Sequence, residues 1–79
     1  MANSVNRVVI GRRQILREIK KNNVAEIVIA SDAEANYIAG LIEVAKQAAV
    51  PYALRGTMNE ISAQYGIEVP SGAVGILKA

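Results

Sequence analysis

The feature that most constrains the fold is an unbroken apolar run, Ile-Val-Ile-Ala at residues 27–30, which directly follows Glu26. A strand with one face in solvent alternates apolar and polar residues, whereas a continuous apolar run is typical of a strand covered on both faces. We therefore predict a central strand over residues 25–30. Covering both of its faces requires helices on either side of a sheet, which is an α/β architecture.

Segments of strand and helix character alternate along the chain. Ser31 with Glu34, and Thr57 with Glu60, have the spacing of capping boxes, which open helices. Asn22-Asn23, Val50-Pro51 and Gly66 are typical helix ends. We predict strands over residues 8–10, 25–30, 52–54 and 73–77, and helices over residues 12–22, 32–49 and 58–65. This order predicts a single domain with helices on both faces of the sheet.

Composition excludes several classes of function. The 79 residues are 52% hydrophobic and 20% charged, which is globular, and they include no His and no Cys. Ser-His and Cys-His nucleophiles and the common zinc ligand sets are therefore absent. No apolar run approaches the roughly 18–20 residues of a membrane span, and the first residues lack a signal peptide's apolar segment. We expect a cytoplasmic protein with no membrane partner, no catalytic residues, no metal and no cofactor.

The predicted helix after Gly11 concentrates positive charge. Six of the nine Lys and Arg residues lie between residues 7 and 21, with Glu18 as the one acid among them. Arg13 and Arg17 are like charges at i,i+4, and Arg12 and Arg13 occupy the first turn, where the helix dipole disfavours cations. Because these placements oppose helix stability, they favour a negatively charged partner over a merely solvated face. We expect nucleic-acid contacts at Gly11, Arg12, Arg13, Arg17 and Lys20.

The start of this helix has a second property. Gly11 offers no side chain to cap the first turn, so backbone N–H groups are left for water or a ligand. Ile15, Leu16 and Ile19 form an apolar stripe for the core. The predicted strand, Gly11 and the helix start with its arginines together have the features of a phosphate-binding site. Since neither GxxxxGK[ST] nor GxGxxG is present, the phosphates are expected to belong to a polymer.

Two other stretches allow a structural and a functional interpretation. Asp32 and Glu34 are the one close pair of acids, and both have roles as helix-cap residues. The loop from Ile67 to Pro70 carries apolar side chains that either plug the core beneath it or contact unpaired RNA bases. Sequence alone leaves both interpretations of this loop open.

Four motifs in this order resemble the kink-turn RNA-binding ribosomal proteins of the archaeal L7Ae type and their short bacterial relatives. They are Gly11 with Arg13, Gln14 and Arg17, the stretch at residues 27–34, Val50-Pro51-Tyr52, and residues 66–70 before the last strand. The resemblance covers nearly the whole chain. It implies a three-layer α-β-α sandwich with a mixed four-stranded sheet.

The resemblance also implies a function. In that family, the glycine and the residues after it contact the tandem G·A pairs and backbone of a sharply bent RNA. A later loop covers the bulged nucleotides, and an acid and an apolar residue lie near a flipped-out base. The matching positions here are Gly11, Arg13, Gln14, Arg17, Glu34, Ile38, Ile67, Glu68, Val69 and Pro70.

This chain departs from the family pattern at three positions. It has Arg13-Gln14 where the archaeal proteins have Asn-Glu, and Met58 where they have Lys. We expect a non-enzymatic, monomeric, ribosome-associated protein that recognises and stabilises kink-turns in structured RNA such as ribosomal RNA. The alternative is a protein-interaction or scaffold module whose basic face binds RNA without specificity.

Overall fold

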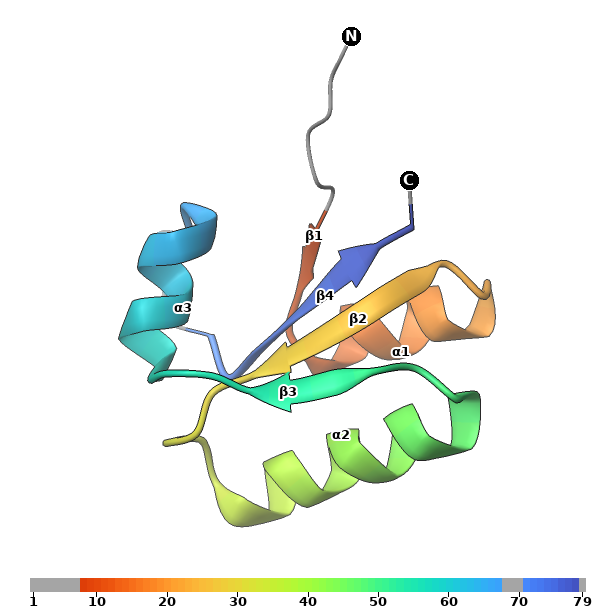
Figure 1. Ribbon diagram of the computed structural model, residues 1–79, viewed down its shortest axis with the longest axis horizontal. Helices are drawn as coiled ribbons and strands as arrows, with labels where there is room; N and C mark the ends of the chain where they lie inside the picture. The colour runs from red at the N-terminus through yellow and green to blue at the C-terminus, as the bar shows by residue number, and fades with distance from the viewer. Residues whose placement is uncertain (1–7, 68–70, 79) are drawn as a thin grey trace, which may run out of the picture.

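The computed structural model describes residues 8–67 and 71–78. Its strands and helices follow the predicted order, and three of the four strands have the predicted bounds (Figure 1). The elements are β1 (Val8–Ile10), α1 (Arg12–Lys20), β2 (Val24–Ile29), α2 (Ala35–Ala48), β3 (Tyr52–Leu54), α3 (Met58–Tyr65) and β4 (Ala73–Leu77).

The sheet has the strand order β1-β4-β2-β3. β4 is antiparallel to both of its neighbours, β1 and β2, whereas β3 is parallel to β2. The sheet is therefore mixed, as predicted. β2 lies between two other strands, which confirms that the apolar run forms an internal strand.

Helices cover both faces of the sheet (Figure 1). α1 and α2 lie against one face, and α3 lies against the other. Successive β2 residues point to opposite sides, so Ile27 and Ile29 pack with α1 and α2, and Val28 packs with Ile61 of α3. These four side chains are at most 2% exposed. Burying one such side chain stabilises a fold by about 1.5–3 kcal/mol, so the packing of β2 is a main source of stability.

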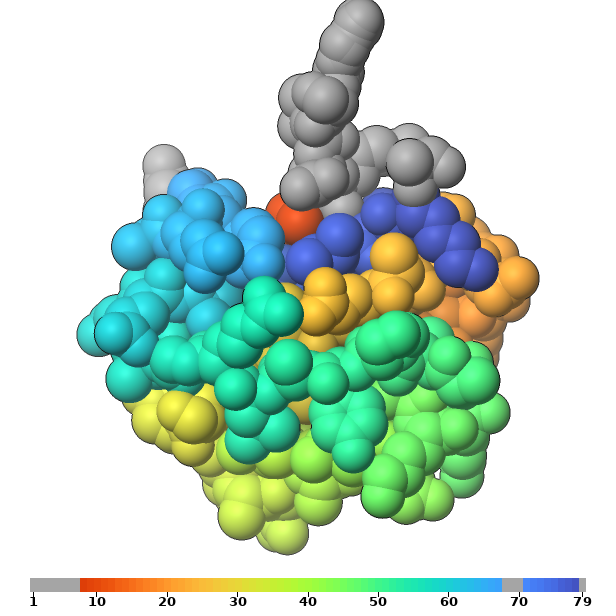
Figure 2. Space-filling view, in the orientation of Figure 1, coloured from red at the N-terminus to blue at the C-terminus, as the bar shows by residue number. Residues whose placement is uncertain are grey.

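The two helical layers differ in extent. α3 is short, and Figure 2 shows atoms of β2 and β4 reaching the surface beside it. Glu26 and Arg55 form an ion pair of 3.2 Å on this part of the molecule. The α3 layer therefore covers only one end of its face of the sheet.

Four connections meet at one end of the sheet. The register pairs Ile10 with Val74, and Ile29 with both Ala73 and Leu54, so β1, β2 and β3 end where β4 begins. The Gly11 N–H donates a hydrogen bond to the Ala73 carbonyl at 3.1 Å. The sheet thereby gathers at one end the starts of all three helices and the segment that leads into β4.

The predicted capping box of Ser31 and Glu34 is wrong. Glu34 is itself the N-cap of α2, and within the described residues no side-chain cap hydrogen bond is made there. Ser31 Oγ instead donates to the Gly56 carbonyl at 2.8 Å, and Asp32 Oδ1 accepts from the Met58 N–H at 2.9 Å. The turn after β2 lies beside the start of α3, so these polar groups bond across the fold rather than along their own helix.

The other helix ends follow the sequence closely. Thr57 and Glu60 form both bonds of their capping box, as predicted. Gly66 ends α3 in the left-handed conformation, with φ of 69°. α1 ends at Lys20, two residues earlier than predicted, because Lys21 is its C-cap and Asn22 already has a φ of 57°.

We predict that Thr57→Ala lowers the free energy of unfolding by about 1 kcal/mol, because the Glu60 N–H loses its acceptor. Ser31→Ala is the matched control. It should cost less, since the Gly56 carbonyl also accepts from the Ser31 backbone N–H. Urea unfolding of both variants provides the measurement. A larger loss in Ser31→Ala would contradict the observed assignment of the caps.

Candidate nucleic-acid interface

Helix α1 separates an apolar face from a basic one. Ile15 is completely buried and Ile19 packs against the same core, which fixes the rotation of the helix. The opposite surface carries four exposed cations. They are Arg12, Arg13, Arg17 and Lys20.

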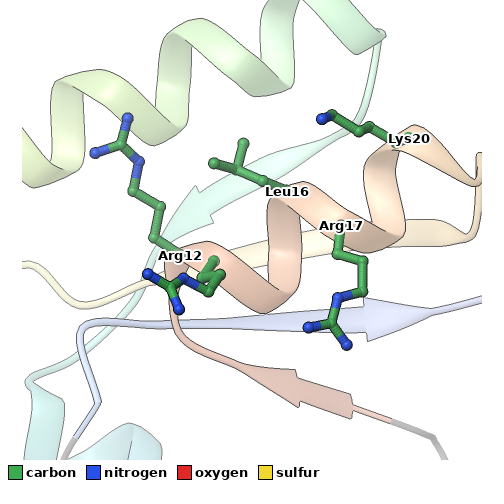
Figure 3. Close-up of a pocket in the computed structure, with 5 residues that line it drawn as sticks. Arg12, Leu16, Arg17 and Lys20 are labelled. Atoms are coloured by element: carbon green, nitrogen blue, oxygen red, sulfur yellow. The ribbon is translucent and has the colours of Figure 1, made fainter.

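A surface groove of about 550 Å³ runs along this basic face, lined by the four cations and Leu16 (Figure 3). The prediction that Leu16 belongs to the core is wrong, because Leu16 is half-buried and lies in the groove. The reason is geometric. Leu16 is one position beyond Ile15, and 100° of helical rotation carries it from the sheet toward the groove.

The groove has cations on both sides. Figure 3 shows Arg12 and Leu16 directed toward α2, with Lys20 in the same row along α1, and Arg17 directed to the opposite side of the helix. Within the described residues, none of the four cations forms an ion pair. Their positive charge is therefore available to an external anion, and it has no acid in the first turn to oppose it.

The start of α1 depends on Gly11. Its φ of 88° and ψ of 159° lie in a region of backbone conformation that is essentially restricted to glycine. Apart from Gly11 itself and its two chain neighbours, no atom of the described residues lies within 4 Å of the position that a Cβ would occupy, so a ligand can approach the backbone here. Gln14 is half-buried one turn further along and does not line the groove.

Within the described residues, the start of α1 has no side-chain cap hydrogen bond, which agrees with the expectation that its first N–H groups are left for water or a ligand. Tyr37 of α2 is partly buried, and burial raises the pKa of its hydroxyl above the ordinary value of 10.0, while Arg12 opposes this shift. The hydroxyl is therefore neutral at physiological pH.

A second pocket, of about 250 Å³, lies near the same end of the sheet. Its lining comes from the turn after β2, from α2, from the start of α3 and from the segment before β4. The lining residues are Ala33, Glu34, Tyr37, Met58 and Gly72. The exposed Glu34 side chain forms no hydrogen bond within the described residues. The pocket thus combines mainly apolar walls with one carboxylate acceptor, which suits a planar ring that donates hydrogen bonds.

The remaining predicted contact residues divide into two groups. Ile38 packs against the core beneath α1 and α2 and lines neither pocket. Ile67 packs against the core beneath α3, and its N–H donates to the Ser62 carbonyl at 2.8 Å. Ile67 therefore has the structural role of a plug. Glu68, Val69 and Pro70 lie outside the described residues.

Of the five residues that line the second pocket, sequence reasoning predicted only Glu34 as a contact, and it missed Ala33, Tyr37, Met58 and Gly72. Tyr37 lies three positions after Glu34, so helical spacing could have placed both on one side of α2. Nothing in the sequence indicated that Gly72 would pack against this ring. A Cβ at Gly72 would lie 2.8 Å from the ring atom Cε2 of Tyr37.

The described residues contain no cluster of three or more Asp or Glu side chains that could hold a metal ion. No helix in the described part of the chain is long and apolar enough to cross a membrane.

We predict that Gly11→Asn destabilises the protein by about 1–3 kcal/mol, although its side chain meets open space. Gly66→Asn is the matched control, because Asn readily adopts the left-handed conformation found at Gly66 but not the conformation of Gly11. Thermal and urea unfolding compare the two. If both variants lost the same free energy of unfolding, the backbone conformation of Gly11 would not be the cause of the destabilisation.

Comparison with known proteins identifies one family over residues 1–79, described as the ribosomal protein L7Ae/L30e/S12e/Gadd45 family. A protein of Geobacillus thermodenitrificans named RNA-binding protein is 32% identical over 72 residues, which cover 91% of this chain and 88% of that one. RNA-binding protein YbxF of Geobacillus stearothermophilus is 31% identical, with the same coverage of both chains.

Solved structures show the same fold. A 15.5kD RNA binding protein of Giardia lamblia superposes with a TM-score of 0.83 at 22% identity, over 91% of this chain and 61% of that one. A protein of unknown function from Bacillus halodurans superposes with a TM-score of 0.84 at 17% identity, over 91% of this chain and 72% of that one. These likenesses confirm the three-layer fold with its mixed sheet.

Proposed function

Because this chain belongs to the ribosomal protein L7Ae/L30e/S12e/Gadd45 family, we propose that it recognises and stabilises kink-turns in structured RNA. The Geobacillus relatives, which it matches over 91% of its length, are named RNA-binding proteins. Membership of this family also supports the prediction that the protein is not an enzyme.

The observation that carries the proposal is the basic groove on α1. None of its cations forms an ion pair in the described part of the chain, and it begins at the open backbone of Gly11. Phosphates contribute most of the affinity of a nucleic-acid complex, so unpaired cations on one helix suit an RNA backbone. In this proposal Arg12, Arg17 and Lys20 contact phosphates.

Specificity in this proposal comes from the start of α1. Open space at Gly11 lets non-canonical base pairs approach the helix closely. Arg13 and Gln14 would then contact the tandem G·A pairs. Arg13 would contact phosphates in place of some of the base contacts expected of the Asn in the archaeal proteins. RNA duplexes are recognised mainly by shape, and a kink-turn offers a distinct one.

The second pocket would receive an unpaired base of the bulge. Glu34 supplies a hydrogen-bond acceptor there, and the walls beside it are largely apolar. Ile38 would support α2 beneath this site rather than contact the base directly. The loop that includes Glu68, Val69 and Pro70 would lie over the bulged nucleotides, with Ile67 anchoring its start in the core.

The mechanism we propose is a shift of an RNA equilibrium. An RNA that alternates between extended and kinked forms moves toward the kinked form by as much as the protein's differential affinity for the two. The protein would act as a monomer in the cytoplasm on ribosomal RNA or another non-coding RNA. It would need no cofactor, because binding alone provides the free energy.

We predict tight binding to a short RNA with a standard kink-turn, measured at about physiological salt. The same RNA with both G·A pairs replaced by Watson–Crick pairs should bind much more weakly, since it lacks the kinked shape. Equal and strongly salt-dependent binding to both RNAs would indicate an unspecific basic helix. Absence of binding to either would favour the protein-interaction alternative.

We predict that Arg13→Ala weakens binding to the kink-turn RNA by about 1–3 kcal/mol. Arg17→Ala, which removes a phosphate contact, should instead reduce the salt dependence of binding by about one unit of slope. Lys46→Ala is the matched control, because Lys46 is an exposed cation near the far end of α2 and lines neither pocket. If Lys46→Ala weakened RNA binding as much as Arg13→Ala, binding would depend on the net charge of the protein and not on the position of Arg13.

A further inference from the structure

Two buried hydroxyls lie between α3 and the start of β4. Among the described residues, only Ser62 and Ser71 are polar and buried, with 6% and 9% of their surface exposed. A buried hydroxyl destabilises a fold unless it forms hydrogen bonds, and an alanine at either position would avoid that cost. The role of these two residues therefore depends on the groups that they bind.

Ser71 is hydrogen-bonded through both its backbone and its side chain. Its N–H donates to Ser62 Oγ of α3 at 3.2 Å. Its own hydroxyl donates to the Ala73 carbonyl at 2.9 Å and accepts from the Ala73 N–H at 3.3 Å. Gly72 lies between these two residues in the chain, so the backbone on either side of it is fixed.

The same short segment bonds to two other parts of the proposed RNA-binding surface. The Gly72 carbonyl accepts from the N–H of Ala30, directly after β2, at 2.8 Å. The Ala73 carbonyl also accepts from the Gly11 N–H, at 3.1 Å. The segment thus joins α3, the end of β2 and the start of α1.

Gly72 in turn determines the position of an aromatic ring. A Cβ at Gly72 would lie 2.8 Å from Cε2 and 3.3 Å from Cζ of Tyr37, so only a glycine lets the backbone come this close to the ring. Gly72 has no positive φ, so the close contact, rather than a special backbone conformation, requires the glycine. Both residues line the second pocket. A displacement of the segment would therefore change the shape of this pocket.

We propose that Ser71 is a positioning residue, which holds Gly72 in place and thereby sets the shape of the second pocket. Ser62 anchors this residue on α3, and Gly72 supports the ring of Tyr37. The proposal rests on the proposed function, in which the pocket receives an unpaired base. Because the segment also bonds to Gly11, it fixes the place of the pocket relative to the start of α1. Two contact sites that are already correctly spaced lose less conformational freedom on binding, which increases affinity.

The test measures how much of the RNA affinity depends on a base in the pocket. Each bulged nucleotide of the kink-turn RNA is made abasic in turn, and binding is compared with that of the intact RNA. The wild-type protein should bind one of these abasic RNAs about fivefold more weakly or worse, because that RNA lacks the base that contacts the pocket. The ratio of the two dissociation constants defines the base dependence.

Ser71→Ala should lower the base dependence about threefold or more, as expected for the loss of one hydrogen bond at the pocket wall. Affinity for the intact RNA should fall, whereas affinity for the abasic RNA should stay the same, since that RNA places nothing in the pocket. Ser62→Ala should act in the same direction, because the Ser71 N–H loses its acceptor. Alanine favours helices more than serine does, so α3 should remain folded in this variant.

Asn23→Ala is the matched control. The Asn23 side-chain amide donates to Glu18 at 3.0 Å at the opposite end of the sheet and lines neither pocket. Its loss should leave the base dependence unchanged, whatever stability is lost in urea unfolding. NMR on free Ser71→Ala should also show weaker nuclear Overhauser contacts between the Gly72 Hα protons and the ring of Tyr37. A lower base dependence in both serine variants, but not in Asn23→Ala, supports the proposal.

Three results would overturn it. Unchanged base dependence in both serine variants would show that the pair does not set the pocket. An equal loss of affinity for intact and abasic RNA would show that the serines act through general stability alone. A wild-type protein without base dependence at any bulged position would show that the pocket receives no base. Failure of the proposed function would also overturn the proposal, but it is seen differently, as equal affinity of the wild-type protein for the kink-turn RNA and its Watson–Crick control.

Discussion

The fold depends on the burial of β2 on both of its faces. Ile27 and Ile29 pack beneath α1 and α2, and Val28 packs beneath α3, so one strand contributes to two cores. A chain of 79 residues without disulfides can bury only a limited apolar area, and burying β2 on both faces supplies much of it. The same packing fixes the rotation of α1 through Ile15, and thereby decides which side chains of α1 face outward.

The position of β4 organises the proposed binding surface. β4 runs antiparallel between β1 and β2, so its start lies beside their ends. Gly11, Glu34 and Gly72 belong to different parts of the chain, yet this arrangement brings their segments to one end of the sheet. Hydrogen bonds from Gly11 to Ala73 and from Ala30 to Gly72 hold the segments together there.

Charge and capping are arranged consistently around this end. α3 is capped by its own Thr57 and by Asp32, both at a helix start where acids and hydroxyls are favourable. α1 has no acid in its first turn, and among the described residues no side-chain cap hydrogen bond is made at its start. The helix that carries the proposed RNA contacts, α1, therefore has no negative charge at its positive end. The missing acid lowers the stability of α1, and the burial of Ile15 offsets this loss.

Sequence alone determined the elements, their order and the basic character of α1, because periodicity, caps and glycines act over a few residues. The capping box of Thr57 and Glu60 is an example, since both partners lie within one turn. Only the tertiary structure decided the partners of Ser31 and Asp32, the position of Leu16 in the groove and the place of Tyr37 in the second pocket. Those outcomes depend on which distant segments meet at the end of the sheet, and the pairing of strands, rather than local residue preference, settles that.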